Sequence, residues 1–375
     1  MRLAGAISTL PGAFGRSARR TTIPVRPAPA LAPILLAPIR LVQARLALTL
    51  LAPVLLALAL AGCDEAAPPA PDPVATTASE TTVAPRVALV MKTLTNPFFL
   101  KMEQGARRAA DDLGAELVVR TGAQETSIEQ QVAIVDELVA DNVSAIVIAP
   151  GDSVRLIPAV KRAREAGIPV VNIDNRLDPD FLARAGITDV PFISVDNEAG
   201  AYLATRRLVA DAASPAAAFV LEGIRGADNA EARRRGAVRG FEEAGVPIVA
   251  SESANWKIDE AYDVTKRVLI AHPEITHLFA ANDMMALGAS RYLRDAGRFD
   301  VRVAGFDALE EARQAIATGE LQASIDQQAD VQGYTGVDYA LRLLRGESVP
   351  TETIIDVLVV DTETLNTAPP PAGGQ

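Results

Sequence analysis

Residues 86–113, RVALVMKTLTNPFFLKMEQGARRAADDL, place a short apolar run, Val87–Met91, before a longer segment with helical spacing. In the second segment Phe99, Met102 and Ala106 recur at three- and four-residue steps, which indicates a helix with one buried face. Alternating strands and helices of this kind build parallel sheets, because parallel strands must be joined by crossovers. This stretch therefore predicts an α/β fold.

The same alternation continues to about residue 305. Further strands are expected at Leu117–Val119, Ala145–Ile148, Pro169–Ile173, Phe192–Val195, Ala217–Leu221, Pro247–Ala250, Thr276–Ala280 and Val301–Gly305. Further helices are expected at Ile128–Val139, Glu198–Ala212, Ala230–Ala244, Asp259–Ala271 and Met284–Ala296. A second series of strands begins near Phe192, so the pattern predicts two doubly wound parallel-sheet lobes with helices on both faces.

The N-terminal part contains an apolar run, Leu46–Leu60, that ends in Ala61-Gly62-Cys63 with the only cysteine of the chain. Small residues before a cysteine at the end of such a run are typical of a lipoprotein processing site, where the Cys63 thiol is acylated. We therefore expect residues 1–62 to be a signal peptide and the protein to be lipid-anchored in the periplasm or on the outer face of the cytoplasmic membrane. A cleaved secretory peptide or an uncleaved anchor is the alternative.

Two segments outside the alternating pattern lack hydrophobic periodicity. Residues 63–85 are rich in Pro, Ala and Thr and are expected to form a tether between lipid and domain. Residues 367–375 are expected to be a disordered tail. The roughly 280 residues between them are enough for one large domain or two of medium size.

Charge and composition exclude several classes of function. Removing residues 1–63 takes seven of the 36 basic residues and none of the 47 acidic ones, which leaves a net charge of −18. Nucleic acid, which needs concentrated Lys and Arg, is therefore not an expected partner. One cysteine and two histidines are too few soft ligands for a zinc site. No phosphate loop or Gly-x-Ser-x-Gly elbow is found in the sequence, so we expect no cofactor, no metal and no enzyme activity.

Polar and aromatic residues gather where the expected strands end, and ligands of parallel α/β sheets bind beyond these carboxyl ends. Taken singly, each is explained as a cap, a turn former or a core aromatic. Together, forked polar groups pair well with vicinal hydroxyls, and flat rings pack on the C–H faces of a sugar. The candidate ligand-binding residues are Asn96, Phe98, Phe99, Asp174, Asn175, Arg233, Trp256, Asn282, Phe306, Asp307 and Gln327.

Three motifs resemble the periplasmic sugar-binding proteins of ABC transporters, in particular the ribose-binding and galactose/glucose-binding proteins. They are TNPFF at residues 95–99, FAANDMMALG at 279–288 and VAGFD at 303–307, and the resemblance covers nearly all of residues 86–362. It implies the type I periplasmic binding fold, with two lobes joined by a three-strand hinge. The implied lobes are residues 86–195 with 328–354, and residues 196–327 with 355–366.

The resemblance also implies roles for individual residues. Hydroxyl bonds are implied for Asn96, Asp174, Arg233, Asn282, Asp307 and Gln327, and stacking on the sugar ring for Phe98, Trp256 and Phe306. Two positions depart from the ribose-binding pattern: Ala149 stands in place of an asparagine, and Asn175 in place of an arginine, with Arg176 one place late. These departures remove two polar contacts of a ribose-type pocket.

We expect a monomeric extracytoplasmic solute-binding lipoprotein that captures a pentose, hexose or related polyol between closing lobes and delivers it to an ABC permease. One alternative is a sensor lipoprotein that presents its ligand to a membrane receptor. The ligand-sensing domain of a repressor is disfavoured, because residues 1–85 are leader and tether instead of a helix-turn-helix. A paired-carboxylate glycosidase would use Asp174 and Asp307, but both match binding positions of the family.

Overall fold

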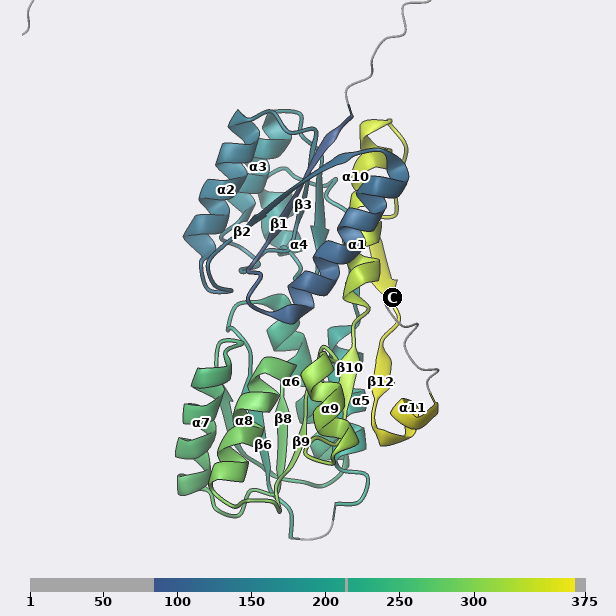
Figure 1. Ribbon diagram of the computed structural model, residues 1–375. Helices are drawn as coiled ribbons and strands as arrows, with labels where there is room; N and C mark the ends of the chain where they lie inside the picture. Colours follow the sequence, from purple (N-terminus) through teal and green to yellow (C-terminus); the bar gives the residue numbers. More distant parts are fainter. Residues whose placement is uncertain (1–83, 213–214, 368–375) are drawn as a thin grey trace, which may run out of the picture. The chain divides into compact units, whose positions relative to one another are not determined.

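The computed structural model describes residues 84–212 and 215–367 (Figure 1). Cys63 and the expected signal peptide lie outside the described residues, as do most of the tether and of the tail. Thr367, which we assigned to the tail, ends a short helix. The described chain forms two parallel sheets and a short antiparallel pair of strands.

The first sheet has six parallel strands in the order β11-β5-β4-β3-β1-β2. Its strands are β1 (Arg86–Met91), β2 (Glu116–Thr121), β3 (Ala145–Ile148), β4 (Val170–Ile173), β5 (Phe192–Val195) and β11 (Glu352–Ile355). The helices around it are α1 (Pro97–Leu113), α2 (Ile128–Ala140), α3 (Ile157–Glu165), α4 (Pro179–Arg184) and α10 (Ala329–Leu344).

The second sheet has four parallel strands in the order β7-β6-β8-β9. Its strands are β6 (Ala218–Glu222), β7 (Ile248–Ser253), β8 (His277–Ala280) and β9 (Arg302–Ala304). The antiparallel pair, β10 (Ser324–Asp326) and β12 (Leu358–Val360), continues this sheet through a bridge between Ala304 and Ala323. The helices of this lobe are α5 (Asn197–Leu208), α6 (Asp228–Glu243), α7 (Ile258–Ala271), α8 (Asp283–Asp295), α9 (Glu310–Ala317) and α11 (Thr362–Thr367).

The expected α/β fold with two parallel-sheet lobes is confirmed. The chain passes between the lobes three times: from β5 to α5, from β10 to α10, and from β11 to β12. The alternating pattern alone places β5 at the start of the second series, but β5 pairs with β4 in the first sheet. The lobe bounds implied by the resemblance, residues 86–195 for the first lobe, include this strand. A hydrophobic pattern shows that a strand is buried, and it does not show which strand becomes its neighbour.

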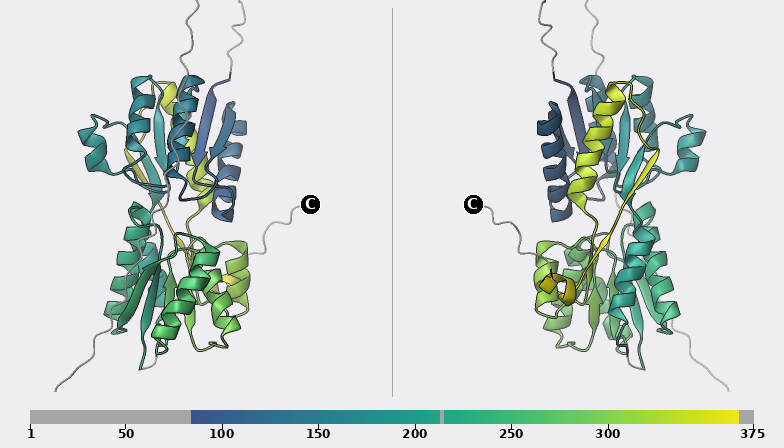
Figure 2. Two further views of the ribbon diagram at one scale, coloured as in Figure 1. Left: turned by 90° about the vertical axis from the view of Figure 1, so that its left-hand side faces the viewer. Right: turned by 90° about the vertical axis from the view of Figure 1, so that its right-hand side faces the viewer.

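Both faces of the first sheet are covered, as the apolar character of its strands predicts (Figure 2). In β1, Val87, Leu89 and Met91 pack in one cluster with residues of α1 and α10. Ala88 and Val90, which alternate with them, pack in a second cluster with residues of α2 and α3. Strand β1 is therefore buried on both sides, and residues that follow its C-terminal end line the cleft described below.

Helices α1 and α10 approach each other at backbone distance. A Cβ atom on Gly105 of α1 would lie 1.9 Å from the carbonyl oxygen of Asp330, and one on Gly333 of α10 would lie 2.0 Å from that of Met102. Both positions therefore require glycine. This contact fixes α10, which begins two residues after Gln327, against the helix that carries Phe98 and Phe99.

We expect Gly105→Ala to lower the free energy of unfolding by about 1–3 kcal/mol, because the added methyl group meets a backbone oxygen that cannot move alone. Differential scanning calorimetry of the purified chain measures this as a lower melting temperature. Gln104→Ala, at an exposed position of the same helix, is the matched control and should melt close to wild type. An unchanged melting temperature for Gly105→Ala would contradict the close packing.

Candidate ligand-binding site

Side chains from both lobes line one narrow cleft, whose cavity volume is about 10 Å³. They stand at or beyond the carboxyl ends of strands of both sheets, the edge at which parallel sheets bind ligands. The lining residues are Lys92, Asn96, Phe98, Phe99, Glu125, Asp174, Asn229, Arg233, Trp256, Asn282, Asp307 and Gln327.

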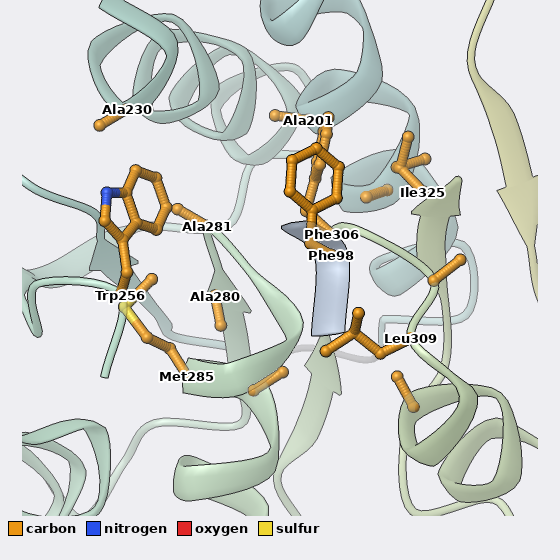
Figure 3. Packing of buried hydrophobic residues seen from close by; sticks show 14 of the residues in the cluster. Phe98, Ala201, Ala230, Trp256, Ala280, Ala281, Met285, Phe306, Leu309 and Ile325 are labelled. Atoms are coloured by element: carbon orange, nitrogen blue, oxygen red, sulfur yellow. The ribbon is translucent and has the colours of Figure 1, made fainter. Parts of the chain in front are cut away.

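Nine of the eleven residues predicted from the sequence line this cleft, and Asn175 and Phe306 do not. The nine are Asn96, Phe98, Phe99, Asp174, Arg233, Trp256, Asn282, Asp307 and Gln327. Phe98 and Trp256, which come from different lobes, belong to the same cluster of buried residues (Figure 3). The cleft thus brings together segments that are more than 150 residues apart in the chain.

The two remaining candidates lie behind the lining. The Asn175 side chain is fully buried, and its Nδ2 donates to the carbonyl oxygen of Pro150 at 3.0 Å. The Phe306 ring is also fully buried, with the guanidinium carbon of Arg233 3.9 Å from its centroid. Phe306 therefore stacks on an arginine of the cleft, where the resemblance implied that it would stack on a sugar ring.

Three lining residues were missed from the sequence: Lys92, Glu125 and Asn229. Lys92 and Asp174 are both buried and form an ion pair, with Nζ 2.7 Å from Oδ2. Glu125 accepts a hydrogen bond from Asn96 Nδ2 at 3.0 Å. Lys92 could have been predicted from the sequence, because it directly follows the buried strand β1, where a lysine that faces only solvent is not expected.

The polar groups of the second lobe hold one another in place. Arg233 donates from Nε to Asn197 Oδ1 at 2.8 Å and from an Nη atom to the carbonyl oxygen of Ala281 at 2.9 Å. The same Nη atom lies 3.6 Å from Asp307 Oδ1, which also accepts from Gln327 Nε2 at 2.6 Å. The guanidinium and the carboxylate are therefore oriented before any ligand arrives.

Four buried side-chain atoms of the lining have no hydrogen-bond partner in the described residues. One of them, Asp174 Oδ2, is ion-paired with Lys92, and the other three are Asn229 Oδ1, Trp256 Nε1 and Gln327 Oε1. An unsatisfied buried polar group costs about 1–3 kcal/mol, and most such groups in native proteins are paired. Two acceptors and one donor that remain unpaired in a single cleft are suited to a ligand that both donates and accepts hydrogen bonds.

Unusual backbone geometry coincides with the cleft. Asp174, Trp256 and Asp307 have positive φ angles of 63°, 66° and 117°, a region that costs non-glycine residues energy and that recurs at functional sites. Trp256 also depends on Gly223, where a Cβ atom would lie 2.0 Å from the indole ring. The indole therefore rests directly on the backbone of the second lobe.

Burial shifts the pKa values of several charged groups. It raises the pKa of Glu125 and that of Asp307, although Lys92 and Arg233 respectively oppose the shift. It lowers the pKa of Arg233. Below the cleft, burial raises the pKa of Asp283 to about 7. The carboxylate of Asp283 accepts hydrogen bonds from the backbone N–H of Leu309 and from Ser324 Oγ, so it fixes the loop that carries Asp307.

These raised pKa values predict a pH dependence of stability. Asp283 titrates near pH 7 when folded and near its ordinary value, about 3.9, when unfolded. Between these values the folded state holds a proton that the unfolded state has released, so the free energy of unfolding falls as the pH rises. We expect a higher melting temperature at pH 5 than at pH 8, and a smaller difference in Asp283→Asn. The exposed Asp263→Asn is the control, and an equal pH slope in both variants would contradict this assignment.

A family model described as a periplasmic binding protein domain matches residues 87–348. The chain belongs to the periplasmic binding protein family. This membership confirms the resemblance drawn from the three motifs, and the two lobes with their three connections have the type I periplasmic binding fold.

The periplasmic binding protein is similar to two curated proteins named for sugars. It is 40% identical over 305 residues to the D-ribose/D-allose-binding protein of Pseudomonas aeruginosa, which covers 79% of this chain and 93% of the relative. It is 33% identical over 286 residues to the D-allose-binding periplasmic protein of Escherichia coli K12, at 74% and 91% coverage. A solved ABC transporter solute-binding protein of Actinobacillus succinogenes with bound D-allose aligns with a TM-score of 0.72 and 38% identity, covering 76% of this chain and all of the other.

The described residues, 84–212 and 215–367, contain no candidate metal site and no candidate membrane-spanning helix. No group of three or more His, Cys, Asp or Glu side chains could hold a metal ion there. No helix in these ranges is long and apolar enough to cross a membrane.

Proposed function

We propose that this periplasmic binding protein captures a neutral monosaccharide between its two lobes and delivers it to an ABC permease. The observation that carries the proposal is the cleft itself, which is lined from both lobes and retains unpaired buried hydrogen-bonding atoms beside an indole and a phenyl ring. A sugar satisfies both features, because its hydroxyls donate and accept while its C–H faces pack on aromatic rings.

In the proposed mechanism the sugar binds one lobe and the other lobe closes over it. The lobes are residues 86–195 with 328–354 and residues 196–327 with 355–366, and they move about the three connecting segments. Closure is favoured only by contacts that exist in the closed form, so both lobes must touch the ligand. Asn96 and Phe98 supply such contacts from the first lobe, and Trp256 and Asp307 from the second.

The charges of the cleft support a neutral ligand. Two cations, Lys92 and Arg233, face three carboxylates from Glu125, Asp174 and Asp307. No excess of positive charge remains for a sugar acid or a sugar phosphate. D-Allose and D-ribose are the first sugars to test, because the relatives are named for them. The departures at Ala149 and Asn175 from the ribose-type pattern count against a ribose-type pocket.

We also propose that the protein acts as a monomer and does not transform the sugar. A paired-carboxylate mechanism needs one carboxyl group free to donate a proton and another free to attack or to activate water. Asp174 is ion-paired with Lys92, and Asp307 is held by Gln327 and Arg233. These partners suit binding more than proton transfer.

Asp307→Ala tests the proposed site. We expect the wild-type chain to bind D-allose and the variant to lose about ten- to 150-fold in affinity, which is the loss when a hydrogen bond to a charged group, about 1.5–3 kcal/mol, is removed. Fluorescence of Trp256, the only tryptophan of the chain, reports binding at this cleft, and calorimetry gives the dissociation constant.

Asp263→Ala, which removes an exposed carboxylate outside the cleft, is the matched control and should bind like wild type. Equal affinity of the Asp307 and Asp263 variants would show that the sugar binds elsewhere. If the wild-type chain binds no pentose, hexose or polyol, the proposed function is wrong.

A lipid anchor on Cys63 is part of the proposal and rests on the sequence around that residue. Cys63→Ser removes the thiol that would be acylated, so we expect the variant to move from the membrane fraction to the soluble fraction of cells that express the full chain. Mass spectrometry of the wild-type N-terminus should show an acylated Cys63. Wild-type protein in the soluble fraction, with residues 1–62 removed and Cys63 unmodified, would favour the secretory alternative.

A further inference from the structure

Helix α6 of the second lobe begins without a cap from its own lobe. Its N-cap position is Ala227, whose side chain cannot accept a hydrogen bond. The first N–H groups of a helix have no partner within the helix, and an N-cap side chain ordinarily satisfies them. The first amides of α6, those of Asp228 and Asn229, must therefore find acceptors elsewhere.

The acceptors come from the first lobe. Ser153 Oγ accepts from the backbone N–H of Asp228 at 3.0 Å, and Asn175 Oδ1 accepts from that of Asn229 at 3.2 Å. Beside them, Asn229 Nδ2 donates to Asp174 Oδ1 at 3.4 Å. Each of these bonds joins the two lobes, and none of them involves a ligand.

The two accepting side chains are held in place within their own lobe. Asn175 donates from Nδ2 to the carbonyl oxygen of Pro150 at 3.0 Å and to Ser153 Oγ at 3.4 Å. Both side chains are buried, and neither lines the cleft. Ser153 and Asn175 thus form a fixed pair of acceptors that meets the start of α6 where the lobes touch.

We propose that Ser153 and Asn175 cap helix α6 only when the lobes are closed, and that they set sugar affinity by stabilising the closed form. This inference rests on the proposed function and names two positioning residues for it. In the open form the same amides are bonded to water. The cap therefore favours closure by the difference in free energy between a hydrogen bond to a buried side chain and one to water. The apparent dissociation constant equals the intrinsic constant divided by the population of the closed form.

This mechanism has a signature that distinguishes it from ligand contact. A residue that touches the sugar discriminates between sugars, whereas a residue that only shifts the closing equilibrium changes every affinity by one factor. Loss of an N-cap side chain corresponds to about a fivefold change in an equilibrium constant. Ser153 and Asn175 should therefore scale the affinities for D-allose and D-ribose equally.

The experiment measures the affinities of wild type, Ser153→Ala and Asn175→Ala for both sugars by Trp256 fluorescence. We expect each variant to bind about fivefold more weakly, with an unchanged ratio of the two affinities. Ser144→Ala is the matched control, because Ser144 also accepts a hydrogen bond from a backbone amide, that of Arg86, but within one lobe. It should bind like wild type. Ser153→Ala keeps the bond from Asn175 to Pro150, so it remains informative if Asn175→Ala folds poorly.

Two outcomes would overturn the cap. One is unchanged affinity in a folded Ser153→Ala, and the other is a change in the ratio of the two affinities, which would indicate contact with the sugar. A wild-type chain that binds neither sugar would count against the proposed function instead. Hydrogen exchange at the amide of Asp228, whose acceptor is Ser153 Oγ, then tests the cap alone: faster exchange in Ser153→Ala than in wild type supports it, and equal exchange overturns it.

Discussion

The geometry of parallel strands is the constraint on which the rest of this structure depends. All strands of a parallel sheet end at one edge, so the residues that follow them converge without being close in sequence. Here such edges of two sheets form one cleft, and its lining includes residues that follow β1, β4, β8 and β9. The apolar strands bury both faces of the sheets, which leaves this edge as the place where polar side chains can gather.

Burial raises the free-energy cost of the charged groups in the cleft. Lys92 and Asp174 are almost fully removed from water, and so are Arg233 and Asp307. Removing one partner of a buried pair leaves an uncompensated charge, which is far more costly than losing a surface ion pair. The same closeness orients the groups, because each charged side chain is held by at least one other polar group. The side chains of the site therefore have a fixed geometry that lowers the stability of the fold. The raised pKa of Asp307, which is caused by burial, is one sign of this cost.

Much of this could be predicted from the sequence because it depends on local patterns. Alternating apolar runs predicted the strands of both sheets except β11, and the strand ends predicted nine residues of the cleft. The failures depend on contacts that no local pattern reveals. Phe306 follows a strand as a ligand-facing aromatic should, but its ring lies under Arg233. Asn175 follows Asp174 directly, yet it turns away from the cleft toward Pro150. Lys92 was overlooked because its buried partner, Asp174, is 82 residues away in the chain.

The position of β1 has a mechanical consequence. The described chain enters at Ala84 and runs into β1 at the N-terminal edge of the first sheet, opposite the edge that lines the cleft (Figure 1). Residue 84 is therefore joined to the first lobe alone, on the side away from the cleft. In the proposed closing motion, the second lobe can swing toward the first while this entry point stays in place.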